Sequence, residues 1–134
     1  GTFYPDPLKM VKILEKLDVD GITLHLREDR RHIIDTDVIR IIKETNLPVN
    51  LEMAATEEMQ NIATELMPNA VCLVPERREE RTTEGGLDVI CEEEKLKSFL
   101  YPLVQKKIRI SLFVSPETCQ MLLKVQTSPK VVCL

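Results

Sequence analysis

The chain lacks tryptophan, has few other aromatic residues and carries no excess of positive charge. Aromatic residues make up 4% of its 134 residues, and the formal net charge at pH 7 is -4. Nucleic-acid binding needs a cationic surface to neutralise phosphates, and single-stranded bases stack on aromatic side chains. The composition therefore argues against a dedicated nucleic-acid-binding protein, and any basic patch must be local.

Long apolar runs, a leader segment and cysteine motifs are also missing. No apolar run approaches the roughly 20 residues of a membrane-spanning helix, and the first residues lack the basic and then apolar layout of a signal peptide. Cys72, Cys91, Cys119 and Cys133 form no Cys-x-x-Cys pair and have no histidine at metal-ligand spacing. We therefore expect a cytoplasmic protein with reduced thiols, no metal site and no membrane contact.

The length allows one domain of moderate size. With 134 residues, 43% of them hydrophobic, the chain can bury a real core. A whole (β/α)8 barrel, in contrast, needs about 250 residues. One compact domain over residues 1–134 is therefore the most that this chain can form.

Helical and strand patterns alternate along the sequence. Apolar residues recur at helical spacing over residues 7–17, from Asp35 to Asn46-Leu47-Pro48, from Thr56 to Pro68, around 96–103 and after Ser115. Between these segments, β-type runs predict strands over 21–25, 49–53, 70–74, 109–114 and 130–134. We expect Asp35 to cap the second helix, and Pro102 to kink or shorten the fourth.

This alternation predicts the fold class. Helices and strands follow one another through short connections, apart from a polar loop at residues 75–88. Such an order is typical of parallel strands joined by right-handed helical crossovers. The sequence therefore predicts an α/β protein with a parallel sheet.

The first strand ends in a cluster of polar residues. His25 and Arg27 lie two positions apart, so they share one face of an extended segment. An imidazole can accept or return a proton near neutral pH, and a guanidinium binds phosphate or carboxylate groups. The pair indicates an anionic substrate that undergoes proton transfer. The alternative is a solvated charged loop, which is what usually follows a strand.

Two further strands lead into polar chemistry. Glu52 shares a face of the second strand with Asn50, and the loop after the third strand contains Thr82 and two glycines at 85–86 that can wrap around an anion. The carboxyl ends of parallel strands meet at one edge, where α/β enzymes keep their active sites. Glu52 is therefore a candidate base, although a lone carboxylate is more often a salt-bridge partner.

Three blocks of sequence resemble the pyridoxine 5'-phosphate synthase family. They are Gly21-Ile-Thr-Leu-His-Leu-Arg-Glu-Asp-Arg-Arg-His-Ile33, then Asn50-Leu-Glu-Met-Ala54 with Thr56-Glu-Glu-Met59, and then Val71-Cys-Leu-Val-Pro75 with Thr82-Thr-Glu-Gly-Gly-Leu-Asp-Val89. The resemblance extends over residues 4–113. It implies a (β/α)8 barrel enzyme that condenses 1-deoxy-D-xylulose 5-phosphate with 3-amino-2-oxopropyl phosphate to form pyridoxine 5'-phosphate, without a cofactor or a metal.

The resemblance also implies roles for individual residues. His25 and Glu52 fall on positions that accept protons in this family, whereas Arg27, His32 and Thr82 fall on positions that contact the deoxyxylulose phosphate. Family members assemble as homo-oligomers. The resemblance therefore implies two small phosphorylated substrates as partners, and neither a nucleic acid nor a membrane is expected.

The resemblance is incomplete at both ends of the sequence. The family's first strand with its Asn-x-Asp-His motif is absent, and residues 131–134 replace the strand in which the family carries a glutamate before a His-Thr-Gly motif. We therefore expect a fragment that forms part of a TIM barrel and is inactive alone. Two alternatives are another sugar-phosphate-binding barrel enzyme, and an interaction module that uses Arg27, Arg30 and Arg31.

Overall fold

The computed structural model describes residues 5–76, 85–89, 91–115 and 132–133. Its elements are, in order, α1 (Pro7–Leu14), the 3-10 helix η1 (Glu15–Leu17), β1 (Ile22–His25), α2 (Asp35–Glu44), β2 (Val49–Met53), α3 (Glu57–Leu66), β3 (Ala70–Leu73), α4 (Glu93–Gln105), β4 (Arg109–Leu112) and β5 (Val132–Cys133). None of the helices found in these ranges is long and apolar enough to cross a membrane.

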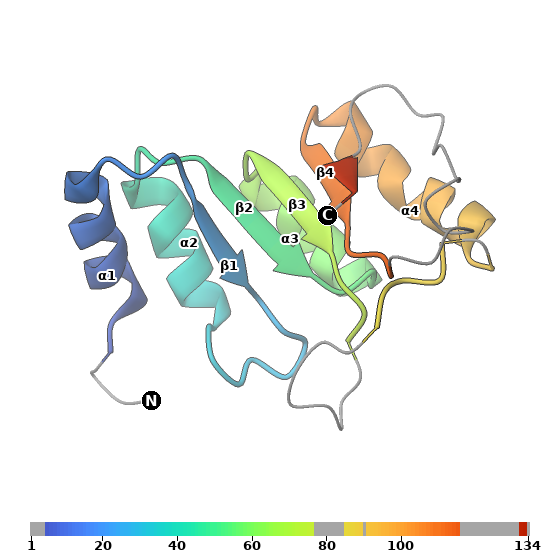
Figure 1. Cartoon of the computed structure of the whole chain (residues 1–134), viewed down its shortest axis with the longest axis horizontal. Helices are drawn as coiled ribbons and strands as arrows, with labels where there is room; N and C mark the ends of the chain where they lie inside the picture. Colours follow the sequence, from blue (N-terminus) through green and yellow to red (C-terminus); the bar gives the residue numbers. More distant parts are fainter. Residues whose placement is uncertain (1–4, 77–84, 90, 116–131, 134) are drawn as a thin grey trace.

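The five strands form one parallel sheet in the order of the sequence, β1-β2-β3-β4-β5. Successive crossovers between neighbouring parallel strands that share the usual right-handed sense place their helices on one face. Figure 1 shows this arrangement, with the helices packed behind the strands. The prediction of an α/β fold with parallel strands is confirmed.

The helix-covered face of the sheet contains the hydrophobic core. Strand residues that point to this face include Leu51 and Val71, both fully buried, and they pack in one cluster with helix residues such as Val38, Met59 and Leu103. Each of these helix residues belongs to an apolar stripe at helical spacing. The alternation of apolar and polar residues in the strands therefore turns the apolar set towards the helices.

The opposite face of the sheet carries mostly polar residues. The parallel register aligns Thr23 with Asn50, and His25 with Glu52, and Glu52 in turn with Cys72. These residues alternate with the core residues along each strand, so they point away from the helices. Alternate side chains of each strand point to opposite faces of the sheet. The strands that bury apolar residues on one face therefore place candidate catalytic groups on the face without helices.

One prediction about a helix end is wrong. Ile34, not Asp35, caps α2, and Asp35 is its first helical residue; the Ile34 amide donates instead to the carboxylate of Asp37 at 3.3 Å. The Asp35 side chain is bound to Arg30, which explains why it does not act as the cap. Pro102 lies inside α4, which continues to Gln105, so of the two expected effects the shortening at this residue is not found.

The remaining boundaries differ by a few residues. The helix predicted over residues 7–17 is an α-helix only as far as Leu14, and then becomes a 3-10 turn that ends at Asp18, whose φ of 56° is left-handed. Asp6 caps this helix, and its carboxylate accepts from the Leu8 amide at 3.0 Å. The helix predicted after Ser115 lies outside the described residues.

The core position of Leu51 makes a test of this packing possible. Leu51→Ala removes a fully buried side chain from the central part of the sheet, so we expect the free energy of unfolding to fall by about 2–5 kcal/mol. The same substitution at Leu17, which is 65% exposed, should change it by less than about 0.5 kcal/mol. Urea unfolding of both variants measures the difference, and equal losses would contradict the assigned core.

Candidate active site

The carboxyl ends of β1 and β2 and the segment after β3 bring three ionisable side chains together. The Nε2 atom of His25 lies 2.8 Å from Oε1 of Glu76, and its Nδ1 atom lies 3.8 Å from Oε2 of Glu52. His25 and Glu52 meet because the sheet register pairs them directly. The predicted cluster of His25 and Glu52 therefore exists, and it contains a second carboxylate.

Glu76 is the most buried member of this cluster. Its side chain is 4% exposed, compared with 25% for His25 and 34% for Glu52. Its second oxygen, Oε2, accepts a hydrogen bond from the backbone amide of Glu28 at 3.1 Å. A buried carboxylate needs such partners because it leaves water. Glu76 therefore ties the His25 ring to the first residues of the connection between β1 and α2.

Arg27 follows β1, two residues after His25, and is also buried. Its side chain is 7% exposed, and its Nε atom has no hydrogen-bond partner within the described ranges, although Oδ1 of Asp29 lies 3.5 Å away. A buried donor without a partner is costly in free energy. The strand pairing continues up to this residue, since the Leu26 amide donates to the Glu52 carbonyl at 3.1 Å. Arg27 is thus a buried cation at the strand end that can still accept an anionic ligand.

The arginines that follow Arg27 are bound by carboxylates. Arg30 donates to both oxygens of Asp35, at 2.9 and 3.0 Å, and also pairs with Glu58. Arg31 donates to Asp29 at 2.7 Å. The hydrogen bonds from Arg30 and Arg31 lower the pKa values of Asp35 and Asp29, respectively. These ion pairs link residues of the connection after β1 to one another and to α3. They also neutralise positive charge that the alternative of an arginine-based interaction module would need.

One of the other two predicted substrate contacts, His32, lines a different part of the surface. His32 is exposed and lines a hollow of about 650 Å³ together with Asp6, Arg31 and Arg40, at the start of α2. His25, Glu52 and Arg27 do not line this hollow. Thr82 lies outside the described residues, so its predicted contact stays a prediction.

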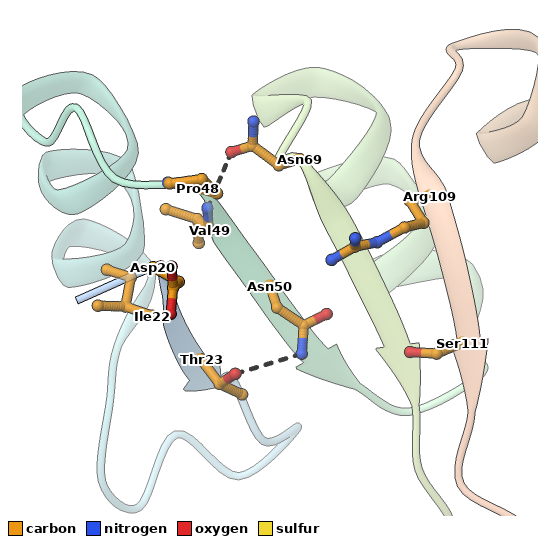
Figure 2. Close-up of a pocket in the computed structure, with 10 residues that line it drawn as sticks. Asp20, Ile22, Thr23, Pro48, Val49, Asn50, Asn69, Arg109 and Ser111 are labelled. Atoms are coloured by element: carbon orange, nitrogen blue, oxygen red, sulfur yellow. Dashed lines mark hydrogen bonds between the residues drawn. The ribbon is translucent and has the colours of Figure 1, made fainter. Parts of the chain in front are cut away.

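A second hollow, of about 390 Å³, lies at the opposite ends of the strands. Figure 2 shows Thr23, Asn50, Arg109 and Ser111 around it, with the Asn50 amide donating to the Thr23 hydroxyl at 3.4 Å. Its lining residues include one acid, Asp20, but no histidine. Active sites of parallel α/β sheets lie at the carboxyl ends of the strands. The cluster around His25 is therefore the better candidate for a catalytic site.

Two other groups bear on chemistry at the sheet. Burial raises the pKa of the Cys72 thiol, so this cysteine is a poor nucleophile and packs as a small apolar residue. Among the residues that the structure describes, no group of three or more histidine, cysteine, aspartate and glutamate side chains is placed to hold a metal ion. The arrangement is suited to proton transfer between the imidazole and the carboxylates, and a buried arginine follows the same strand.

Sequence reasoning missed Glu76. The residue follows Pro75 at the end of a buried strand, which is the position that had already drawn attention to His25 and Glu52. The argument that polar residues at the carboxyl end of a parallel strand are candidate site residues therefore applied to the third strand as well as to the first two. The missing signal was burial, because a charged residue at the start of a polar loop is normally exposed.

Comparison with known proteins identifies the family of this chain and several relatives. The model of the family described as pyridoxal phosphate biosynthesis protein PdxJ matches residues 1–134. The chain belongs to this family. It is 52% identical over 121 residues to the pyridoxine 5'-phosphate synthase of Ruegeria pomeroyi, covering 90% of this chain and 49% of that protein. The proteins of the same name from Thioalkalivibrio sulfidiphilus and a Sulfurihydrogenibium species are 55% and 56% identical, covering 90% and 87% of this chain and 49% of each relative.

Membership of this family fits the observed architecture. The alternating helices and parallel strands are those of part of a TIM barrel, the fold of the PdxJ family. The chain spans about half the length of the curated relatives that it matches. The described part of the chain thus holds successive βα units of the barrel and the strand ends that carry His25 and Glu52.

The pair formed by Arg30 and Asp35 predicts a dependence of stability on pH. Arg30 lowers the pKa of Asp35 in the folded chain, whereas an aspartate in an unfolded chain has a pKa of about 3.9. The stabilisation is therefore present above about pH 4 and is lost as the pH falls below that value. At pH 7, Asp35→Asn should lower the free energy of unfolding by about 0.2–1 kcal/mol, because Asp35 is partly exposed.

A double-mutant cycle provides the control for this pair. In an Arg30→Met background, Asp35→Asn should have little effect on urea unfolding between pH 3 and pH 7. A difference between wild type and Asp35→Asn that stays constant over this pH range would show that the charge of Asp35 contributes nothing.

Proposed function

We propose that this chain carries part of the active site of a pyridoxine 5'-phosphate synthase. In this reaction 1-deoxy-D-xylulose 5-phosphate condenses with 3-amino-2-oxopropyl phosphate to give pyridoxine 5'-phosphate, phosphate and water. One observation carries the proposal, namely that His25 and Glu52 lie 3.8 Å apart at the strand ends, where buried Arg27 follows β1 two residues after His25. The names of the relatives, at 52–56% identity, support it.

The proposed reaction needs groups that accept protons. Ring closure removes protons from carbon and oxygen atoms of the substrates and releases water and phosphate. His25 and Glu52 serve as general bases, because both lie on the face of the sheet without helices and their reactive atoms are 3.8 Å apart. Their partial exposure, 25% and 34%, leaves them within reach of a bound substrate.

The reaction also needs a group that holds a phosphorylated substrate. Arg27 takes this role, since its guanidinium is buried and its Nε atom has no hydrogen-bond partner within the described ranges. In a site of low polarity, its attraction for an anion is stronger than in water. His32 on the same connection and Thr82 on the loop after β3 are further contacts to the sugar phosphate in this proposal.

Product formation tests the proposed reaction. The 134-residue chain is assayed alone and joined to the flanking segments of the Ruegeria pomeroyi relative, with pyridoxine 5'-phosphate measured as the product. We expect product from the joined chain and little from the 134-residue chain. A joined chain that is folded yet makes no product from the two phosphates would favour another sugar-phosphate-binding barrel enzyme.

Substitutions in the joined chain separate proton transfer from binding. Glu52→Gln keeps the shape of the side chain but removes a base, so kcat should fall by about 10²–10⁴ with little change in KM. Arg27→Ala should chiefly raise KM for the deoxyxylulose phosphate, by about 10- to 100-fold, because a charged hydrogen bond is lost.

Arg109 offers a matched control for the loss of an arginine. It is an exposed residue of the hollow at the other ends of the strands, so Arg109→Ala should change neither kcat nor KM. If Arg27→Ala and Arg109→Ala give the same KM as the joined chain, Arg27 does not bind the substrate. Unchanged turnover in Glu52→Gln would exclude Glu52 as a base.

A further inference from the structure

The hydrogen bonds of Glu76 leave it little freedom. One carboxylate oxygen lies 2.8 Å from Nε2 of His25, and the other accepts from the Glu28 backbone amide at 3.1 Å. The side chain is 4% exposed, so water does not compete for these oxygens. A backbone amide is always a donor, which fixes the orientation of the carboxylate relative to the ring.

This geometry selects one tautomer of His25. An ionised carboxylate only accepts hydrogen bonds, whereas a neutral imidazole has one protonated and one unprotonated nitrogen. A proton on Nε2 makes a hydrogen bond to Glu76, but a proton on Nδ1 would leave two lone pairs facing each other at 2.8 Å. The neutral ring is therefore held with its proton on Nε2 and its basic lone pair on Nδ1.

We propose that Glu76 is a positioning residue that keeps Nδ1 of His25 unprotonated and turned towards Glu52. The statement that Nδ1 takes the substrate proton rests on the proposed function, whereas the tautomer does not. Nδ1 and Oε2 of Glu52 lie 3.8 Å apart, so the two bases border one space. Since the bonded Glu28 amide directly follows Arg27, the same carboxylate also fixes the backbone next to the anion-binding arginine.

The tautomer can be measured in the 134-residue chain without any turnover. The chain has two histidines, His25 and His32, so ¹⁵N-labelled histidine gives two rings, and His32→Gln assigns them. The spectra are recorded at a pH where the ring shifts no longer change, so that the imidazole is neutral. We expect Nε2 of His25 to be the protonated nitrogen. A protonated Nδ1 in the wild-type chain would overturn the proposal.

Glu76→Gln tests whether Glu76 causes this preference. The amide oxygen of the glutamine stays on the Glu28 amide, because that donor cannot change, and its NH₂ group then faces Nε2 and donates to it. The proton should therefore move to Nδ1. Glu52→Gln is the matched control, since its NH₂ group can donate to Nδ1 and should preserve the wild-type tautomer.

The outcomes of the two substitutions are distinct. A Glu76→Gln chain that keeps its proton on Nε2 would show that Glu76 does not hold the ring, and inversion in both variants would show that the tautomer does not depend on Glu76 specifically. Both results contradict the proposal. The backbone amide spectrum reports whether each variant is folded, and the wild-type measurement decides the tautomer even if Glu76→Gln does not fold.

Kinetics of the joined chain address the role of Nδ1. Glu76→Gln should lower kcat by about 10²-fold or more without changing KM, because the basic lone pair then faces the wrong side of the ring. An inverted tautomer with unchanged kcat would exclude Nδ1 as the base. A joined chain without any product would instead count against the proposed reaction and leave the measured tautomer, and with it the positioning role, in place.

Discussion

The register between β1 and β2 is the constraint on which the rest of the structure depends. It aligns His25 with Glu52 on the face of the sheet without helices, while Leu24 and Leu51 alternate with them towards the core. A shift of one residue would exchange the apolar residues with the polar ones. Apolar side chains would then face water, and charged side chains would face the helices. The packing of the core and the pairing of His25 with Glu52 are therefore consequences of a single alignment of strands.

Stability and function compete where this sheet ends. Glu76 and Arg27 are nearly fully buried charges, and burial of a charge is unfavourable unless partners compensate for it. Glu76 has such partners in His25 and the Glu28 amide, but the Nε atom of Arg27 has no hydrogen-bond partner within the described ranges. An unpaired donor at this position is what a site for an anionic substrate requires. The core beneath the sheet supplies the stability that tolerates it.

Local patterns sufficed to predict the strands, most helices and the meeting of His25 with Glu52, because parallel strands deliver their ends to one edge. They did not reveal the burial of Glu76, which depends on the path of the chain after Pro75 rather than on its neighbours in sequence. The cap at Asp35 was predicted wrongly because Arg30 competes for its carboxylate. The position of His32 in a separate hollow likewise depends on how the connection after β1 is folded, and sequence spacing carries little information about that.

Binding of 1-deoxy-D-xylulose 5-phosphate to the 134-residue chain tests the central claim most directly. The claim is that the carboxyl ends of the strands, and not the hollow at their other ends, hold an anionic substrate. We predict that titration produces saturable shifts in the backbone amide spectrum at Arg27, Glu52 and Glu76. Shifts confined to the surroundings of Asp20 and Arg109, or no saturable shifts at all, would contradict the account.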